Sequence, residues 1–297
     1  MRSCLGNEER CALDQAIFDT VDAFRRSVRT VVGSELCFPT SLDASQRVLR
    51  AVENPDIGLA SLAKILVAEP LLSAKVIRLA NSVALNPGGP IVRDVRQAVL
   101  RVGMDPIKSL AMVLVMDQLR QAQRHGPCRD LANRLWERSV HVAALSYVMA
   151  KKMTRLNPDE AMFAGVVHDL GRFYLLSRAV DFPELLENRT VLAETINDLS
   201  EEISRAVLGA LNLPESVVET VLAARTYSGT LPPATPSDLL FVACAVSPRR
   251  DPIDELDGRV IEAPNSAVTL KLDQGTVAEV IAASGDEIYS IVVALET

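Results

Sequence analysis

The sequence FAGVVHDLGRFYL, from Phe163 to Leu175, places the adjacent pair His168-Asp169 inside an otherwise apolar segment. Imidazole and carboxylate groups are ligands for divalent metals, and the apolar neighbours predict that the pair is buried. The pair is therefore either part of a metal site that performs chemistry or a remnant that holds the structure in place. The rest of the sequence has to supply more ligands for the first interpretation.

Helical periodicity dominates the chain around this pair. Apolar residues recur at steps of three and four between Leu62 and Ala80, which lines one face of a helix. Asp105 and Asn157 each place a capping side chain before a proline, which suits the first position of a helix. We predict an all-α fold. The prolines predicted to begin helices are Pro70, Pro106, Pro158 and Pro214.

Glycine and proline mark the breaks between the predicted helices. The stretch SGTLPPATPSD, residues 228–238, combines four of these residues and is interpreted as the boundary of the main domain. We predict three parts: an N-terminal helical segment (1–37), a multi-helical domain (38–235) and a mostly helical C-terminal extension (236–297). Within the last part, residues 260–272 could hold a short extended piece.

The net charge of the chain argues against nonspecific binding to nucleic acids. The chain has 297 residues, and 31 Lys and Arg against 38 Asp and Glu give a net charge of −7, which disfavours nonspecific nucleic-acid binding. A short basic run, Arg25, Arg26 and Arg29, is interpreted as a solvated helix face. No nucleic-acid partner is expected.

Cysteine usage and hydropathy predict a cytoplasmic protein. The five cysteines are scattered and form no C-x-x-C pair, which is typical of reduced thiols. The first ten residues are polar and charged, unlike a signal peptide. The most apolar run, Leu110–Met116, is far shorter than the roughly 20 residues that cross a bilayer. No membrane association is expected.

Four short segments of the chain have a specific order and spacing. They are LANS (79–82), QA (97–98) with Gly103 following, LW (135–136) and GVVHDLG (165–171). Together they resemble the HDOD domain, a bacterial regulatory relative of the HD and HD-GYP metal-dependent phosphohydrolases. The resemblance extends over residues 38–227 and implies an all-α, HD-like fold and a role in signal transduction.

The same resemblance implies where metal ligands would lie. In the enzymatic relatives a distant His, the His–Asp pair and a further His or Asp hold the metals that activate water. This chain has only three histidines, His125, His141 and His168. HDOD relatives commonly read W-x-H-S where this chain reads WERS at 136–139, so Arg138 takes the position of the histidine.

The helix predicted around Arg138 also shows whether His141 could be a metal ligand. Apolar residues from Leu131 to Met149 step by four and three, which places Arg138 in the middle of the inward face. His141 lies about 60° from that face and is interpreted as a surface or packing residue. Arg225 stands where relatives often carry a His–His pair, and it shares a helix face with apolar residues. Carboxylates of an upstream acidic run, Asp198, Glu201 and Glu202, are expected to face solvent.

Arginine cannot bind a metal, because it stays protonated and has only donors. We therefore expect a non-catalytic regulatory protein that binds signalling protein partners. It would have no catalytic residue, no cofactor, and no tightly bound metal at the vestigial pair His168 and Asp169. The degenerate-site pocket would consist of Arg138, His168, Asp169 and Arg225.

Two alternatives to this regulatory role stay open. One is a metal-dependent phosphohydrolase or phosphodiesterase with an unusual ligand set. The other is a nucleotide-binding sensor without turnover, in which the arginines would suit a phosphate.

The charge of Asp169 gives the sharpest expectation. A buried carboxylate without a partner costs several kcal/mol, and a metal would normally offset that cost. Arg138 lies on the inward face of its helix, so we predict an ion pair between Arg138 and Asp169 at the former metal position. The alternative is that Arg138 extends to solvent and Asp169 hydrogen-bonds nearby backbone.

Overall fold

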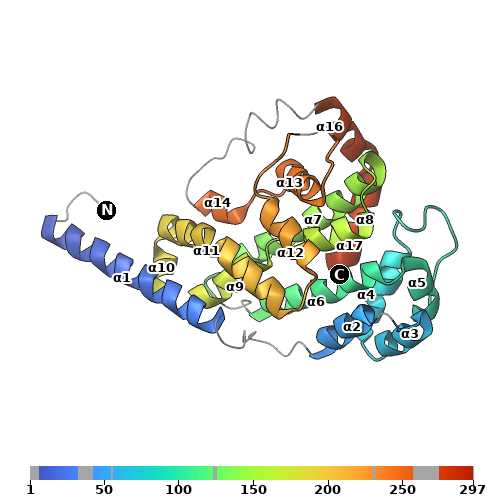
Figure 1. Cartoon of the computed structure of the whole chain (residues 1–297), viewed down its shortest axis with the longest axis horizontal. Coiled ribbons are helices and arrows are strands. Elements are labelled where there is room, and N and C mark those ends of the chain that lie inside the picture. Colours follow the sequence, from blue (N-terminus) through green and yellow to red (C-terminus); the bar gives the residue numbers. More distant parts are fainter. Residues whose placement is uncertain are drawn as a thin grey trace.

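Every regular element in the described part of the chain is a helix, which confirms the predicted all-α fold (Figure 1). The computed structural model describes residues 7–32, 43–54, 56–122, 126–229, 232–256 and 274–296. The helices are α1 (Asn7–Val32), α2 (Asp43–Glu53), α3 (Leu59–Val67), α4 (Pro70–Ala80), α5 (Val95–Val102), α6 (Asp105–Ala122), α7 (Arg129–Met153), α8 (Pro158–Val167), α9 (Leu170–Ala179), α10 (Pro183–Glu187), α11 (Arg189–Ala210), α12 (Glu215–Ala223), α13 (Pro236–Val246), α14 (Pro252–Leu256), α16 (Gln274–Ala283) and α17 (Gly285–Glu296).

The long helix α7 is the central element of the molecule. It packs along α8 and also contacts α6, α9, α13, α14, α16 and α17. From Val142 to Ala150 all of its residues are buried, including the small polar Ser146. A helix that is covered on all sides has to be apolar around its whole circumference, and this stretch of α7 is.

The chain breaks between α8 and α9 at the pair His168-Asp169. The apolar sequence from Asp159 to Leu175 predicts one continuous helix, and that prediction is wrong at these two residues, which form a turn. Neighbouring side chains on a continuous helix diverge by about 100°. Asp169, with φ −99° and ψ 8°, leaves the helical conformation, and this lets both side chains point at Arg138.

Two glycines allow close packing on either side of this turn. A Cβ atom at Gly165 would lie 2.5 Å from Cα of Ala143 in α7, and one at Gly171 would lie 2.7 Å from Cα of Ser204 in α11. Since real Cβ atoms do not approach backbone this closely, only glycine lets α8 and α9 sit at these distances from their neighbours. The glycines therefore fix the position of the His–Asp turn between α7 and α11.

Helices α2–α5 gather at one end of the molecule (Figure 1). Asn81 connects the end of α4 to the loop before α5: its amide donates to the carbonyl oxygens of Ile77 and Val92, at 2.9 and 2.7 Å, and accepts from the amide of Val92 at 2.8 Å. Gly103 ends α5 with a φ of 82°, a conformation that favours glycine. Asn81 of the LANS segment and Gly103 thus have structural roles.

Two of the predicted helix starts are confirmed and two are shifted by one residue. Pro70 begins α4, and the Asn157 side chain caps α8 by accepting from the amide of Asp159 at 2.9 Å. Asp105, predicted as a cap, is instead the first residue of α6, and Pro214 precedes α12 rather than beginning it. Proline is tolerated at each of these positions because the first amides of a helix have no partner within it.

The N-terminal helix α1 lies against α9, α10 and α11, and its first turns extend away from the body of the molecule (Figure 1). Arg25 pairs with Asp198 at 2.8 Å, and Arg29 pairs with Glu202 at 2.9 Å. All four side chains are at least 39% exposed, so the basic run and the acidic run face solvent as predicted while they hold α1 on α11. Such exposed pairs contribute at most about 1 kcal/mol each.

The C-terminal helices pack on the rest of the molecule rather than apart from it. Helix α17 contacts α4 and α7, and the ammonium of Lys75 donates to the carbonyl of Leu295 at 2.6 Å. Burial lowers the pKa of Lys75 to about 8.

The division of the chain into three parts at 37/38 and 235/236 stays a prediction. His125 and the extended piece expected at 260–272 fall outside the described residues. Within the described part of the chain, no helix combines the length and the apolar character needed to cross a membrane.

Candidate functional site

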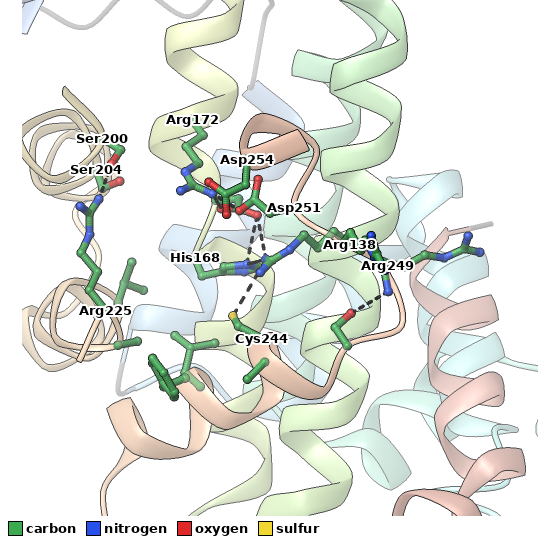
Figure 2. Close-up of a pocket in the computed structure, with 18 of the residues that line it drawn as sticks. Arg138, His168, Arg172, Ser200, Ser204, Arg225, Cys244, Arg249, Asp251 and Asp254 are labelled. Atoms are coloured by element: carbon green, nitrogen blue, oxygen red, sulfur yellow. Dashed lines mark hydrogen bonds and ion pairs between the residues drawn. The ribbon is translucent and has the colours of Figure 1, made fainter. Parts of the chain in front are cut away.

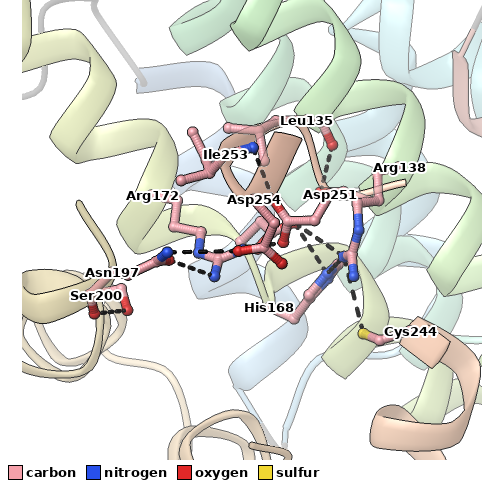
Figure 3. A network of polar contacts seen from close by, with 12 residues as sticks. Leu135, Arg138, His168, Arg172, Asn197, Ser200, Cys244, Asp251, Ile253 and Asp254 are labelled. Atoms are coloured by element: carbon pink, nitrogen blue, oxygen red, sulfur yellow. Dashed lines mark hydrogen bonds and ion pairs between the residues drawn. The ribbon is translucent and has the colours of Figure 1, made fainter. Parts of the chain in front are cut away.

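Arg138 and His168 meet in the interior of the molecule (Figures 2 and 3), and Asp169 contacts both of them. The Nη1 atom of Arg138 lies 2.7 Å from Nε2 of His168 and 3.3 Å from Oδ2 of Asp169. Their side chains are only 9%, 8% and 4% exposed. The predicted ion pair between Arg138 and Asp169 is confirmed, and the alternative in which Arg138 extends to solvent is wrong.

A second arginine, which we did not predict, lies on the other side of Asp169. The Nη1 atom of Arg172 is 3.5 Å from Oδ1 of Asp169 and also pairs with Asp251, while its Nη2 donates to the side chain of Asn197 at 3.0 Å (Figure 3). Asp251 accepts from the amide of Ile253 at 3.0 Å. Asp251-Pro252 is a cap-and-proline signal in the sequence, but nothing local to it indicates that its partner is Arg172.

The two arginines stabilise the charged form of Asp169. Burial alone would raise the pKa of this carboxyl group, but His168, Arg138 and Arg172 together outweigh that effect and hold it well below its usual range. Asp169 is therefore ionised at neutral pH. Its charge is balanced inside the protein by guanidinium groups, which remain protonated at all accessible pH values.

The ring of His168 is fully engaged by its neighbours. Its Nδ1 lies 2.7 Å from the carbonyl oxygen of Gly165, to which it donates. As a neutral ring, His168 accepts from Arg138 through Nε2; as an imidazolium, it donates from Nε2 to Asp169, which lies 3.1 Å away. In neither state does His168 have a lone pair left for another group.

The residues present do not fit the metal that the HD fold implies. His168 has no available lone pair, and the Asp169 oxygen that would face a metal contacts Arg138 and His168. A metal ion at this point would lie beside a permanent cation, which costs Coulomb energy in a buried site. Among the described residues, no three His, Cys, Asp or Glu side chains are grouped so that they could hold a metal. No step of a reaction is therefore derived through one.

Cys244 of α13 also reaches this centre and was not predicted. Its Sγ lies 4.0 Å from Nη1 of Arg138. Burial would raise the pKa of the thiol, but His168 and Arg138 outweigh it and lower the pKa. Because Cys244 is distant from the other site residues in sequence and belongs to no motif, only the packing of α13 on α7 reveals it.

The fourth predicted residue, Arg225, lies across a cavity from Arg138 and His168 (Figure 2). Its Nη2 donates to the hydroxyl of Ser200 in α11, so it turns inward as predicted but does not contact Asp169. His141 does not line the cavity; its Nδ1 is buried and has no hydrogen-bond partner among the described residues. The interpretation of His141 as a packing residue agrees with this position.

A profile of the HDOD domain matches residues 38–227, which is more than half of the chain. The chain belongs to the HDOD family. A curated relative, an uncharacterized protein of Treponema pallidum, is 23% identical over an alignment of 188 residues that covers 59% of this chain. The HDOD chain spans 35% of the length of that relative.

Solved structures share the fold of this HDOD protein. A "Putative metal-dependent phosphohydrolase" from Shewanella amazonensis is 22% identical, with a TM-score of 0.72, over 94% of this chain and 100% of that one. An HDOD domain protein with unknown function from Geobacter sulfurreducens is 21% identical, with a TM-score of 0.61, over 93% and 98% of the two chains. At these identities the similarity establishes the helical fold alone.

Replacing Arg138 by methionine should destabilise the protein by up to about 3–5 kcal/mol, because only His168 and Arg172 then remain to offset the buried charge of Asp169. The folded-state pKa of Asp169 lies below its unfolded value of about 3.9. Its contribution to stability is therefore complete above that value and is lost as the pH falls towards the folded-state pKa. Arg138→Met raises the folded-state pKa, so acid unfolding should begin at a higher pH. Urea unfolding between pH 7 and pH 3 measures both effects.

Arg134→Met is the matched control for this substitution. Arg134 lies one turn earlier on α7 and pairs with Glu255, but both side chains are more than a third exposed. Its loss should cost at most about 1 kcal/mol. An Arg138→Met protein as stable as the control at both ends of the pH range would contradict the assignment of a buried, essential ion pair.

Proposed function

We propose that this HDOD protein is a regulatory protein without phosphohydrolase activity that acts by binding a protein partner. The observation that carries the proposal is the guanidinium of Arg138, which contacts both members of the His168-Asp169 pair. A metal-dependent hydrolase has to keep ligand atoms and an open position for water. Here the ligand atoms of the pair are engaged by Arg138 and by each other.

The distribution of exposed apolar side chains supports the binding of a protein partner. Of the seven large apolar residues that are most exposed in the described chain, five lie between residues 67 and 100, in or beside α3, α4 and α5. Leu71 is 73% exposed and Ile91 is 69% exposed. Exposed apolar side chains that gather at one end of a protein are typical of a surface that binds another protein.

Metal content tests the first part of the proposal. Protein purified without chelator should contain far less than one manganese, iron or zinc ion per chain, and added metal should produce no cleavage of phosphodiesters such as bis(p-nitrophenyl) phosphate or cyclic dinucleotides. About one ion per chain, lost in His168→Ala but kept in His141→Ala, would overturn this part and favour the phosphohydrolase alternative. His141 is the control because it lies outside the cavity.

Crosslinking in the native cell, followed by capture of the tagged full chain, tests the second part. A defined partner should be captured by the wild type and lost in Leu71→Asp. Tyr289→Asp is the control, since Tyr289 is 71% exposed but lies on α17. Equal capture by the two variants would show that the α3–α5 end does not bind the partner, and absence of any specific partner would contradict an adaptor role.

A further inference from the structure

The cavity beside the Arg138 centre is large enough for a small organic ligand. It has a volume of about 690 Å³, within the range of about 300–1,000 Å³ that is usual for such sites. Helices α7, α9, α11, α12, α13 and α14 and the segment between the last two contribute to its wall. The cavity therefore joins residues of the HDOD match to residues beyond its C-terminal end at 227.

The carboxylates that line the cavity are already engaged. Asp169 and Asp251 pair with Arg138 and Arg172. Glu255 pairs with Arg134, which lies outside this cavity. The fourth, Asp254, accepts from Asn197 at 3.5 Å, and burial together with the charge of Asp251 raises its pKa.

Two of the five arginines that line the cavity have no carboxylate partner among the described residues. Arg138 and Arg172 are paired as above, and Arg249 lies 3.5 Å from Glu137. Arg225 contacts only the hydroxyl of Ser200, and Arg250 makes no ion pair within the described chain. Burial and the charge of Arg172 lower the pKa of Arg225, so an anion beside it would relieve an unfavourable environment.

Figure 2 shows the surroundings of Arg225. Its guanidinium points to the α11 face that carries Ser200 and Ser204, and both hydroxyl-bearing residues line the cavity. The hydroxyl of Ser200 donates to the carbonyl of Asn197 at 2.9 Å and accepts from Arg225, so the guanidinium is the donor on this side that can bind a ligand. A planar guanidinium matches the oxygens of a phosphate, to which arginine binds in a bidentate way. This group of residues forms the polar side of the cavity near α11.

The side of the cavity that α12 and α13 form is apolar. Their apolar side chains Val221, Leu222, Leu240 and Phe241 line the same cavity. The ring of Phe241 is held by stacking on Tyr227, with 5.4 Å between centroids and 7° between planes. A fixed aromatic ring beside aliphatic groups suits a flat, weakly polar part of a ligand.

We propose that the cavity binds a small organic phosphate of nucleotide size, with the phosphate at Arg225 beside Ser200 and Ser204 and the flat part against Leu240 and Phe241. The assignment rests on the proposed function, because Arg138 keeps the site free of a hydrolytic metal and the ligand is bound without turnover. It gives the regulatory protein a chemical signal to which its partner binding can respond.

Isothermal titration calorimetry on the full chain tests the assignment with AMP, GMP, CMP, UMP, inorganic phosphate and adenosine as probes. At least one nucleotide should bind with a Kd below about 1 mM. If that nucleotide is AMP, adenosine should bind about ten- to a hundredfold more weakly, because it lacks the charge-assisted contacts of the phosphate. Inorganic phosphate should compete with the nucleotide, and affinity should fall as salt is raised.

Variants locate the ligand within the cavity. Arg225→Gln should weaken binding about ten- to a hundredfold, while Arg205→Gln should leave it unchanged. Arg205 is a suitable control because it lies on α11, is 55% exposed and pairs with Glu215 outside the cavity. Thermal unfolding of both variants checks that they are folded.

Two results would overturn the assignment: no saturable binding of any phosphate probe below about 1 mM, or binding that Arg225→Gln leaves unchanged. Metal-dependent cleavage of a bound phosphate ester would instead overturn the proposed function, while binding that depends on Arg225 would still support the ligand. The two failures can thus be told apart.

Discussion

The ion pair between Arg138 and Asp169 is the interaction on which the rest of the site depends. Both side chains are more than 90% buried, so water offsets little of the charge of either. Losing Asp169 would leave the Arg138 guanidinium without a carboxylate, and losing Arg138 would leave the carboxylate to His168 and Arg172 alone, so either change should destabilise the core. The turn at His168-Asp169 and the close packing at Gly165 and Gly171 together place the carboxylate where the guanidinium can reach it.

An arginine and a metal ion can both neutralise the charge of a buried carboxylate, but they differ in the chemistry that they allow. A metal offers empty coordination positions and lowers the pKa of bound water, whereas a guanidinium offers only hydrogen-bond donors at fixed angles. The charge balance of the interior is retained, but the source of an activated water is not. This difference is the physical basis for our proposal of a binding function rather than a catalytic one.

Sequence alone was sufficient for the features that rest on local pattern or on the family resemblance. The helical periodicity and the cap at Asn157 predicted the fold, and the replacement of a histidine by Arg138 on an inward helix face predicted the ion pair with Asp169. The break between α8 and α9 was missed, because its apolar sequence is also compatible with a continuous helix. The tertiary contact of two adjacent side chains with one arginine overrides that local preference.

The part of the site contributed by the C-terminal region was missed for a different reason. Cys244 and Asp251 are more than 70 residues from the His–Asp pair, and each belongs to a segment whose local pattern indicates only a helix or a cap. Their role arises from the packing of α13 and α14 on α7 and α11. Arg225 was predicted to point inward, but its actual partner, Ser200, depends on the distance between α12 and α11, which periodicity does not determine.

A double-mutant cycle between Arg138 and Asp169 tests the central claim most directly. The free energy of unfolding would be measured for wild type, Arg138→Met, Asp169→Asn and the double variant. A buried pair of opposite charges predicts a favourable coupling energy of about 1–3 kcal/mol, with the double variant more stable than the sum of the single losses implies. Additive losses, equal within about 0.5 kcal/mol, would contradict it.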